Sequence, residues 1–155
     1  MNTRREVLKR SATVASMLIA AGLLPAVARA QAAGYNTAAF EVKTMADLMK
    51  ALGGSAPTES KDVTVQGPDI AENGAVVPVG ASTTLPGVKR LLLLVEKNPN
   101  IMTSMFELTD AVLPSVSTRV KMGQSSNVIA VAMMNDGRVL YAQKEVKVTL
   151  GGCGG

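Results

Sequence analysis

The chain contains a single cysteine, Cys153, with two glycines before it and two glycines after it at the C-terminus. Glycine lacks a Cβ atom and adopts many backbone conformations, and a terminus that is not held in a sheet is usually mobile. A lone cysteine is often a small buried hydrophobe, but this tail has no apolar neighbours with which to pack. The sequence therefore predicts an accessible thiol on a thin, flexible arm formed by Gly151, Gly152, Gly154 and Gly155.

The chemistry around this thiol is sparse. An unperturbed thiol has a pKa of about 8.5, so only a few per cent is thiolate near pH 7. No lysine, arginine or histidine lies within five residues of Cys153 to promote ionisation. What the tail offers is access, because the segment beyond Leu150 can extend roughly 13 Å at about 3.3 Å per residue. This combination is typical of a carrier, whose substrate is held on sulfur while other proteins supply the activation.

Other kinds of active site are poorly supported. The chain has no histidine, which excludes Ser/His/Asp and Cys/His catalytic arrangements. There is no cluster of zinc or blue-copper ligands, and scattered methionines such as Met102, Met105, Met133 and Met134 are more typical of core packing. Three acidic residues that could bind calcium have no recognisable loop spacing, so we expect them on a solvated surface: Asp69, Glu72 and Asp110. The sequence predicts no metal site and no resident cofactor.

Residues 1–30 have the pattern of an export signal. A basic start is followed by an apolar stretch too short and too interrupted to span a membrane, and then by the cleavage pattern Ala28-Arg29-Ala30. The pair Arg4-Arg5 resembles the twin-arginine signal, which a receptor recognises and which carries folded proteins. An ordinary Sec signal is the alternative. Both interpretations predict a bacterial protein of the periplasm.

Removal of this signal changes the charge balance. The whole chain has 16 basic and 12 acidic residues. Five of the basic residues and one acidic residue lie in the signal, which leaves 11 of each sign in residues 31–155. The high isoelectric point therefore comes from the signal, and no basic patch argues for nucleic-acid binding.

The remaining 125 residues suffice for one domain with its own core. We expect a β domain over residues 31–150 and the arm over 151–155. After a linker that ends near Asn36, a short helix is predicted from Met45 to Leu52. Thr44 can cap its start, Gly53 can end it, and its apolar residues recur at helical spacing.

From Lys61 onward the pattern changes to short strands separated by turns. Seven or so strands predict an all-β fold, an immunoglobulin-like antiparallel sandwich. Pro78 suggests an edge strand, and Asn135-Asp136-Gly137 predicts a hairpin turn. The candidate strands are Val63–Val65, Ala75–Val79, Val88–Glu96, Met105–Leu108, Thr118–Met122, Asn127–Met134, Arg138–Tyr141 and Lys144–Leu150.

Two of these segments, Leu91–Val95 and Val128–Met134, are apolar on both faces. In a small sandwich one face of a strand usually meets solvent, so one run could cover a partner subunit. The alternative is that both strands are central in the sheet. The pattern alone does not separate these interpretations.

The C-terminal sequence from Val146 to Gly155 resembles that of the SoxY family, the sulfur carriers of bacterial thiosulfate oxidation. The resemblance covers nearly all of the chain after the signal, and the glycine–cysteine tail is its most specific part. The N-terminal signal departs mildly from the twin-arginine pattern, because Val7 stands where such signals usually have Phe. The other matching segments are Asn73–Val79, Gly87–Arg90, Val95–Asn100, Phe106–Leu108 and Ser117–Met122.

This resemblance implies a heterodimer with a second small β protein, SoxZ, and a role for Cys153 as the site of covalent sulfur attachment. It also implies that partners do the chemistry: a SoxAX-type haem cytochrome, a SoxB-type hydrolase and, in some organisms, a sulfane dehydrogenase. The chain itself would be no enzyme. Two rivals remain: a structural or adhesive module crosslinked through Cys153, and a thiol enzyme, for which no base is present.

Overall fold

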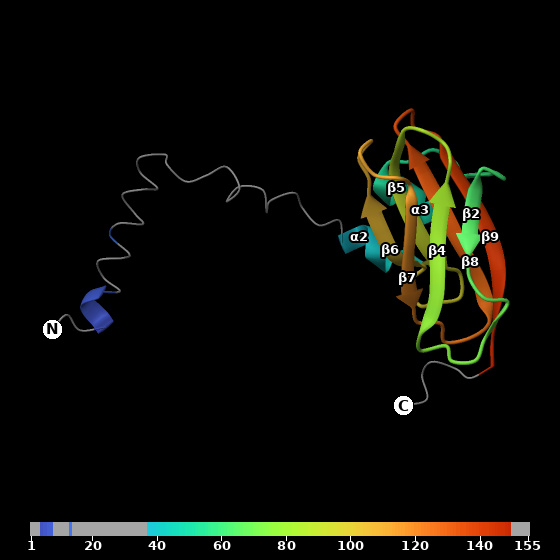
Figure 1. Ribbon diagram of the computed structural model, residues 1–155, viewed down its shortest axis with the longest axis horizontal. Helices are drawn as coiled ribbons and strands as arrows, with labels where there is room; N and C mark the ends of the chain where they lie inside the picture. The colour runs from blue at the N-terminus through green and yellow to red at the C-terminus, as the bar shows by residue number, and fades with distance from the viewer. Residues whose placement is uncertain (1–3, 8–12, 14–36, 150–155) are drawn as a thin grey trace. The chain divides into compact units, whose positions relative to one another are not determined.

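The computed structural model describes residues 4–7, 13 and 37–149, and the chain divides into two units, residues 1–35 and 36–155. In the first unit, residues 4–7 are helical. The second unit is a β sandwich with two short helices (Figure 1). Its elements are α2 (Thr37–Glu41), α3 (Met45–Leu52), β1 (Thr58–Glu59), β2 (Val63–Gln66), β3 (Ile70–Ala71), β4 (Val77–Thr83), β5 (Val88–Val95), β6 (Met102–Glu107), β7 (Ser115–Val120), β8 (Ser126–Met134) and β9 (Val139–Val148).

Two sheets form the sandwich. The larger sheet has the strand order β1-β9-β8-β5-β6, with β3 also paired to β9, and the smaller has the order β2-β4-β7. The strands pair antiparallel except β1 and β3, which run parallel to β9. The all-β prediction is confirmed.

The helix predicted from Met45 to Leu52 is present with the same bounds as α3. Thr44 adopts an extended conformation, and its Oγ1 accepts a hydrogen bond from the Asp47 backbone N–H at 3.1 Å. Gly53 ends the helix at φ 71°, a left-handed conformation that glycine adopts without the steric cost of a Cβ. Local capping signals therefore determine this helix at both ends.

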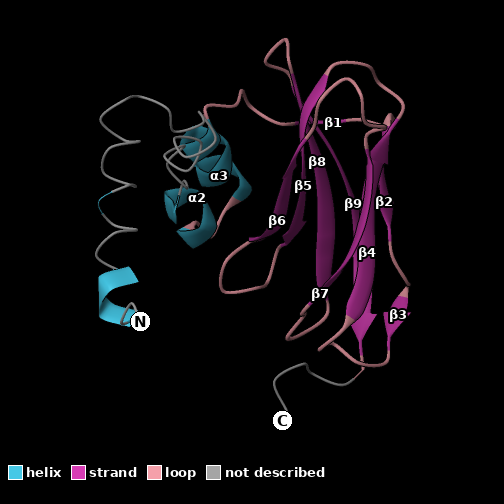
Figure 2. Ribbon diagram, turned by 60° about the vertical axis from the view of Figure 1, so that its left-hand side comes forward, coloured by secondary structure: helices cyan, strands magenta, loops and turns pink. Residues whose placement is uncertain are grey.

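The helices cover the outer face of the larger sheet (Figure 2). Leu48 and Met49 of α3 pack with Leu92 and Leu94 of β5, and Val131 of β8 belongs to the same buried cluster. Each of these five side chains is at most 2% exposed. The outer face of strands β5 and β8 is thus buried by the chain's own helical segment.

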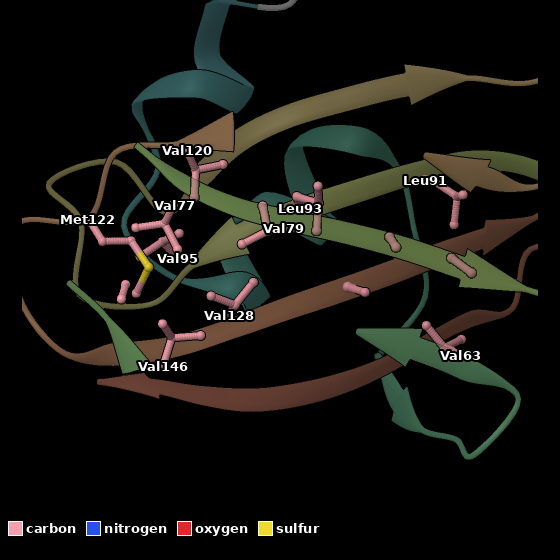
Figure 3. Packing of buried hydrophobic residues seen from close by; sticks show 14 of the residues in the cluster. Val63, Val77, Val79, Leu91, Leu93, Val95, Val120, Met122, Val128 and Val146 are labelled. Carbon is pink, nitrogen blue, oxygen red and sulfur yellow. The ribbon is translucent and has the colours of Figure 1, made fainter. Parts of the chain in front are cut away.

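The second cluster fills the space between the two sheets. Val77 and Val79 of β4 face Leu93 of β5 and Val128 of β8 (Figure 3). Because successive side chains of a strand point to opposite faces, β5 supplies alternate leucines to this cluster and to the cluster under the helices. This alternation explains why the runs Leu91–Val95 and Val128–Met134 are apolar on both faces.

Neither run presents an apolar face that a partner subunit could contact, so the interpretation that one of them covers a partner is wrong. Val131, for instance, is fully buried within the chain. The alternative interpretation, that both strands are central, is confirmed by the order β9-β8-β5-β6.

Pro78 does not mark an edge strand, because β4 is the middle strand of the smaller sheet. Its N–H would point toward β2, but β2 ends at Gln66, which lies opposite Gly80. A proline removes a backbone donor, and at this position β2 offers no residue that would accept from it.

The predicted strands Arg138–Tyr141 and Lys144–Leu150 are one continuous strand as far as Val148, and Leu150 lies outside the described residues.

The turn after β8 forms as predicted. The Gly137 N–H donates to the Met134 carbonyl at 3.1 Å, and the Met134 N–H donates to the Arg138 carbonyl at 2.9 Å. Gly137 has φ 90°, which favours glycine. This hairpin turns the chain into β9, the strand that leads to the C-terminal arm.

Candidate functional site: the root of the C-terminal arm

Strand β9 carries the chain toward Cys153, and it is held on both sides. On one side it pairs with β8 from Met133↔Val139 to Ser126↔Val146. On the other side it pairs with β1 near its start and with β3 near its end. The strand therefore has paired neighbours on both sides near each of its ends, including the end from which the arm begins.

The last described residues are fastened by further hydrogen bonds. The Val148 N–H donates to Ser125 Oγ at 2.9 Å, and the Thr149 N–H donates to the Ala71 carbonyl at 3.1 Å. The hydroxyl of Thr149 donates to the Glu72 carbonyl at 3.2 Å. We call Ser125, Ala71, Glu72, Val148 and Thr149 the arm root.

The loops at this end of the sandwich are also joined to one another. The Met122 N–H donates to the Gly74 carbonyl at 2.7 Å, and the Asn98 side-chain amide donates to the Lys121 carbonyl at 2.8 Å. The Lys97 N–H donates to Ser126 Oγ at 3.0 Å. The arm root is therefore part of a connected platform made by the loops that follow β3, β5 and β7.

An ion pair lies beside the arm root. Lys144 Nζ is 2.9 Å from Asp69 Oδ1 and donates to the Gly67 carbonyl at 2.7 Å. The hydrogen bond from Lys144, and then its positive charge, lower the pKa of the Asp69 carboxyl below its ordinary value. The Lys147 N–H donates to the Asp69 carbonyl at 2.9 Å, so this pair connects the segment before β3 to β9.

Several predicted site residues lie outside the described residues. They are Cys153, Gly151, Gly152, Gly154 and Gly155 of the arm and Ala28 and Ala30 of the predicted cleavage pattern. Arg4 and Arg5 fall in the helical residues 4–7. The predictions for these residues remain predictions.

The acidic residues considered for calcium are not brought together. Asp69 pairs with Lys144, whereas Asp110 lines a hollow near the far end of β4. Among the described residues there is no group of three or more histidine, cysteine, aspartate or glutamate side chains that could bind a metal ion. Of the four methionines considered above, Met105 is partly buried and the other three are buried, with Met133 under the helices and Met134 between the sheets. In the described part of the chain, no helix is long and apolar enough to cross a membrane.

Sequence reasoning missed the residues that hold the arm root. Thr149 immediately precedes the Leu-Gly-Gly segment, and that position could have marked it. Ser125 gave no signal, because it lies 23 residues before Val148, the residue whose backbone N–H it binds.

The sequence pattern of a protein family described as "Sulfur oxidation protein SoxY" matches residues 48–153, which is more than half of the chain. The chain belongs to the SoxY family. The match extends through both sheets and ends at Cys153.

A solved structure described as the sulfur carrier protein SoxY from Chlorobium limicola f thiosulfatophilum is similar to the chain. It is 31% identical in sequence with a TM-score of 0.62, and the alignment covers 70% of this chain and 97% of that one. This likeness agrees with the family match and with the sandwich fold. No match was found among curated protein sequences.

Superoxide reductase (neelaredoxin) from Ignicoccus hospitalis shares the fold, with a TM-score of 0.50 and 18% identity. The alignment covers 56% of this chain and 78% of that one. At this identity the likeness concerns the fold alone. Membership of the SoxY family makes the chain a sulfur oxidation protein.

Proposed function

We propose that the chain is a periplasmic sulfur carrier that holds thiosulfate-derived intermediates covalently on Cys153 and presents them to partner enzymes. The observation that carries this proposal is the SoxY family match, which extends to Cys153. The arm root supports it, because a fixed starting point at Thr149 confines the thiol to a radius of about 13 Å over four extended residues.

Loading of the carrier is an oxidation. The Cys153 thiol and thiosulfate join through a new S–S bond, with release of one proton and two electrons. The sequence contains no redox centre to accept those electrons, so we assign them to a SoxAX-type haem cytochrome. The product is a cysteine S-thiosulfonate, whose terminal group is a sulfonate.

Unloading is a hydrolysis. Water attacks the terminal sulfonate, sulfate leaves, and a persulfide remains on Cys153; a SoxB-type hydrolase would catalyse this step. Where a sulfane dehydrogenase is present, it would oxidise the remaining sulfur. A SoxZ-like β protein completes the carrier as a heterodimer. In this scheme the chain is a substrate-bearing subunit and no enzyme.

The test is a Cys153→Ser variant in a reconstituted system. We expect thiosulfate-dependent turnover to be abolished, because a hydroxyl oxygen cannot form the persulfide-type bonds that hold the cargo. The melting temperature should be unchanged, and mass spectrometry should find thiosulfate on the C-terminal peptide of the parent only. Substantial turnover by the Ser variant would show that the substrate is held elsewhere.

The same experiment addresses the rival function, a structural module crosslinked through Cys153. A crosslinker would form a covalent dimer or mixed disulfide under oxidising conditions and take up no thiosulfate. Non-reducing electrophoresis together with the peptide mass distinguishes these outcomes. A stable protein–protein disulfide without any thiosulfate adduct would contradict the carrier proposal.

A further inference from the structure

The last three described residues of the chain, 147–149, are held differently from the rest of β9. Strand β9 pairs with β8 as far as Ser126↔Val146. Beyond that point its backbone bonds mainly to residues 69–72, which include β3 and which we call the strap. The bonds are Lys147 N–H to the Asp69 carbonyl at 2.9 Å, Thr149 N–H to the Ala71 carbonyl at 3.1 Å and the Thr149 hydroxyl to the Glu72 carbonyl at 3.2 Å.

The other short parallel strand, β1, shows the contrast. It pairs with Leu140 and Tyr141 of β9, and both of these residues are also paired with β8. In the described part of the chain, Lys147 and Val148 pair with β3 alone, and the Val148 N–H is bound by the side chain of Ser125 instead of a strand backbone. Strand β9 is therefore held by two strands along its ladder and by one short strand after it.

Burial changes at the same point. Val146 is fully buried between the sheets, so its release would open the core. Lys147 and Thr149 are exposed, and Val148 is only partly buried against that core. On the strap, Ile70 is 58% exposed. Segments with few buried contacts and solvent-exposed hydrogen bonds open at low free energy, which places the boundary between fixed and releasable residues directly after Val146.

The strap does not depend on the end of β9 for its own position. Before it, the Gly67 carbonyl accepts a hydrogen bond from Lys144 Nζ at 2.7 Å, and Lys144 belongs to the ladder with β8. After it, the Gly74 carbonyl accepts a hydrogen bond from the Met122 N–H at 2.7 Å. Within it, Ala71 is buried and belongs to the core between the sheets. The end of β9 can therefore leave while the strap stays in place.

We propose that residues 147–149 are a releasable section of the carrier arm, which separates from the strap as one unit. In the closed state the arm starts at Thr149, and in the open state it starts at Val146. At about 3.3 Å per residue, the maximum reach to Cys153 rises from roughly 13 Å to roughly 23 Å. This inference rests on the proposed function, because a longer reach matters only for a thiol that must enter the active sites of other proteins.

Amide hydrogen exchange of the chain without its predicted signal tests the release directly, with no partner present. If residues 147–149 separate as a unit, their three amides should have the same protection factor after correction for intrinsic exchange rates. We expect that protection to be at least about a hundredfold lower than that of Val146. Fraying from the end would instead give protection that falls stepwise from Lys147 to Thr149.

The variant Thr149→Val weakens the closed state, because it keeps the shape of the side chain but removes the hydroxyl donor to the Glu72 carbonyl. We expect it to speed exchange of all three amides by the same factor, about three- to tenfold, and to leave Val146 unchanged. Thr103→Val is the matched control, since the Thr103 hydroxyl donates to the Leu93 carbonyl at 2.8 Å, between β6 and β5. It should leave exchange of the three amides unchanged.

A second measurement asks whether the arm uses this release. In the reconstituted system, the loaded chain is the substrate of the enzyme that acts on Cys153. Only the open fraction is competent for an active site deeper than the closed reach. We therefore expect kcat/KM for the loaded Thr149→Val chain to rise by the factor measured in exchange, with no rise for Thr103→Val.

The contrary results are distinguishable. Equal protection of Val146 and Thr149, or stepwise protection from Lys147 to Thr149, would overturn the inference and leave the carrier function intact. Release as a unit with an unchanged kcat/KM would show that the arm does not use it, which also overturns the inference. If the parent chain takes up no thiosulfate on Cys153, the proposed function fails and the inference fails with it, whatever the exchange rates show.

Discussion

Two single residues, Ser125 and Thr149, hold the end of β9 from which the C-terminal arm starts. Ser125 accepts a hydrogen bond from the Val148 N–H, and Thr149 bonds to Ala71, the last residue of β3, and to Glu72, which follows it. Neither residue is reactive, but both hold the backbone at Val148 and Thr149, from which the chain continues to Cys153. Each of these hydrogen bonds makes a net contribution of about 0.5–1.5 kcal/mol to the stability of the folded chain.

Replacement of Ser125 by Ala should loosen the end of β9. The Val148 N–H loses its acceptor, so we expect a loss of about 0.5–1.5 kcal/mol in unfolding free energy. Hydrogen exchange at Val148 and Thr149 should be faster. Ser55→Ala is the control, because its hydroxyl donates to the Gly137 carbonyl near the far hairpin. Equal exchange at Val148 in Ser125→Ala and the parent would contradict the role assigned to Ser125.

At the scale of single elements, the smaller sheet depends on a close approach at Gly80 of β4. A Cβ built at Gly80 would lie 2.8 Å from the Val116 carbonyl oxygen and 2.9 Å from Gln66 Oε1. A Cβ at Gly67 would meet nothing closer than 3.7 Å. A side chain would therefore clash at Gly80, whereas Gly67, which directly follows β2, has room for one.

Gly80→Ala should destabilise the protein by about 1–3 kcal/mol, the usual cost of overpacking. The contact at 2.8 Å is with backbone of β7, which must shift. Gly67→Ala should change stability by less than about 0.5 kcal/mol. Urea unfolding of both variants measures this difference. Equal stability of the two variants would show that the β7 backbone shifts without loss of stability.

The ion pair between Asp69 and Lys144 makes a pH-dependent contribution at the same scale. Lys144 lowers the pKa of Asp69 in the folded state, so the pair stabilises the protein above the ordinary carboxyl pKa of about 3.9. That contribution is lost as the pH falls through the lowered pKa.

In Lys144→Met, the stability should therefore fall less steeply than in the parent as the pH is lowered from about 5. Lys147→Met is the control, three residues further along β9 and on the opposite face of the strand, and should keep the parent slope. Asp136, whose pKa is also lowered, by hydrogen bonds from Arg138, is unchanged in all three proteins. Parallel curves for Lys144→Met and the parent would show that the pair makes no such contribution.

At the scale of the whole molecule, the chain buries the central strands of the larger sheet, β5 and β8, on both faces without a second subunit. The helical segment covers the outer face of β5 and β8, and the smaller sheet covers the inner face. The arm root lies at the end of β9. The loop before β7, with the exposed residue Leu113, lies at the opposite end of the sandwich (Figure 1).

Export is also a property of the whole chain. We expect replacement of both Arg4 and Arg5 by Lys to leave the precursor in the cytoplasm, because the twin-arginine receptor reads the arginine pair. Arg10→Lys, outside the pair, is the control. Fractionation of cells producing each variant measures the result, and a normal periplasmic yield from the double variant would favour the Sec route.

Local sequence determined much of this protein. Thr44 and Gly53 placed the bounds of α3, alternation and turn residues located most of the strands, and the glycine–cysteine tail indicated a carrier. These signals act between residues close in sequence, so they can be recognised without knowledge of the fold. Helix α2 was missed, because its five residues lack such signals and depend on packing, with Ala39 fully buried.

Only the tertiary structure decided how distant segments meet. It placed α3 over β5 and β8, which explained two apolar runs that the sequence left ambiguous. It placed Pro78 in a central strand beyond the end of β2, and it brought Ser125 and Ala71 to the arm root. The partner in each case lies tens of residues away, and strand pairing across that separation depends on the packing of the whole sandwich, for which no short segment carries a signal.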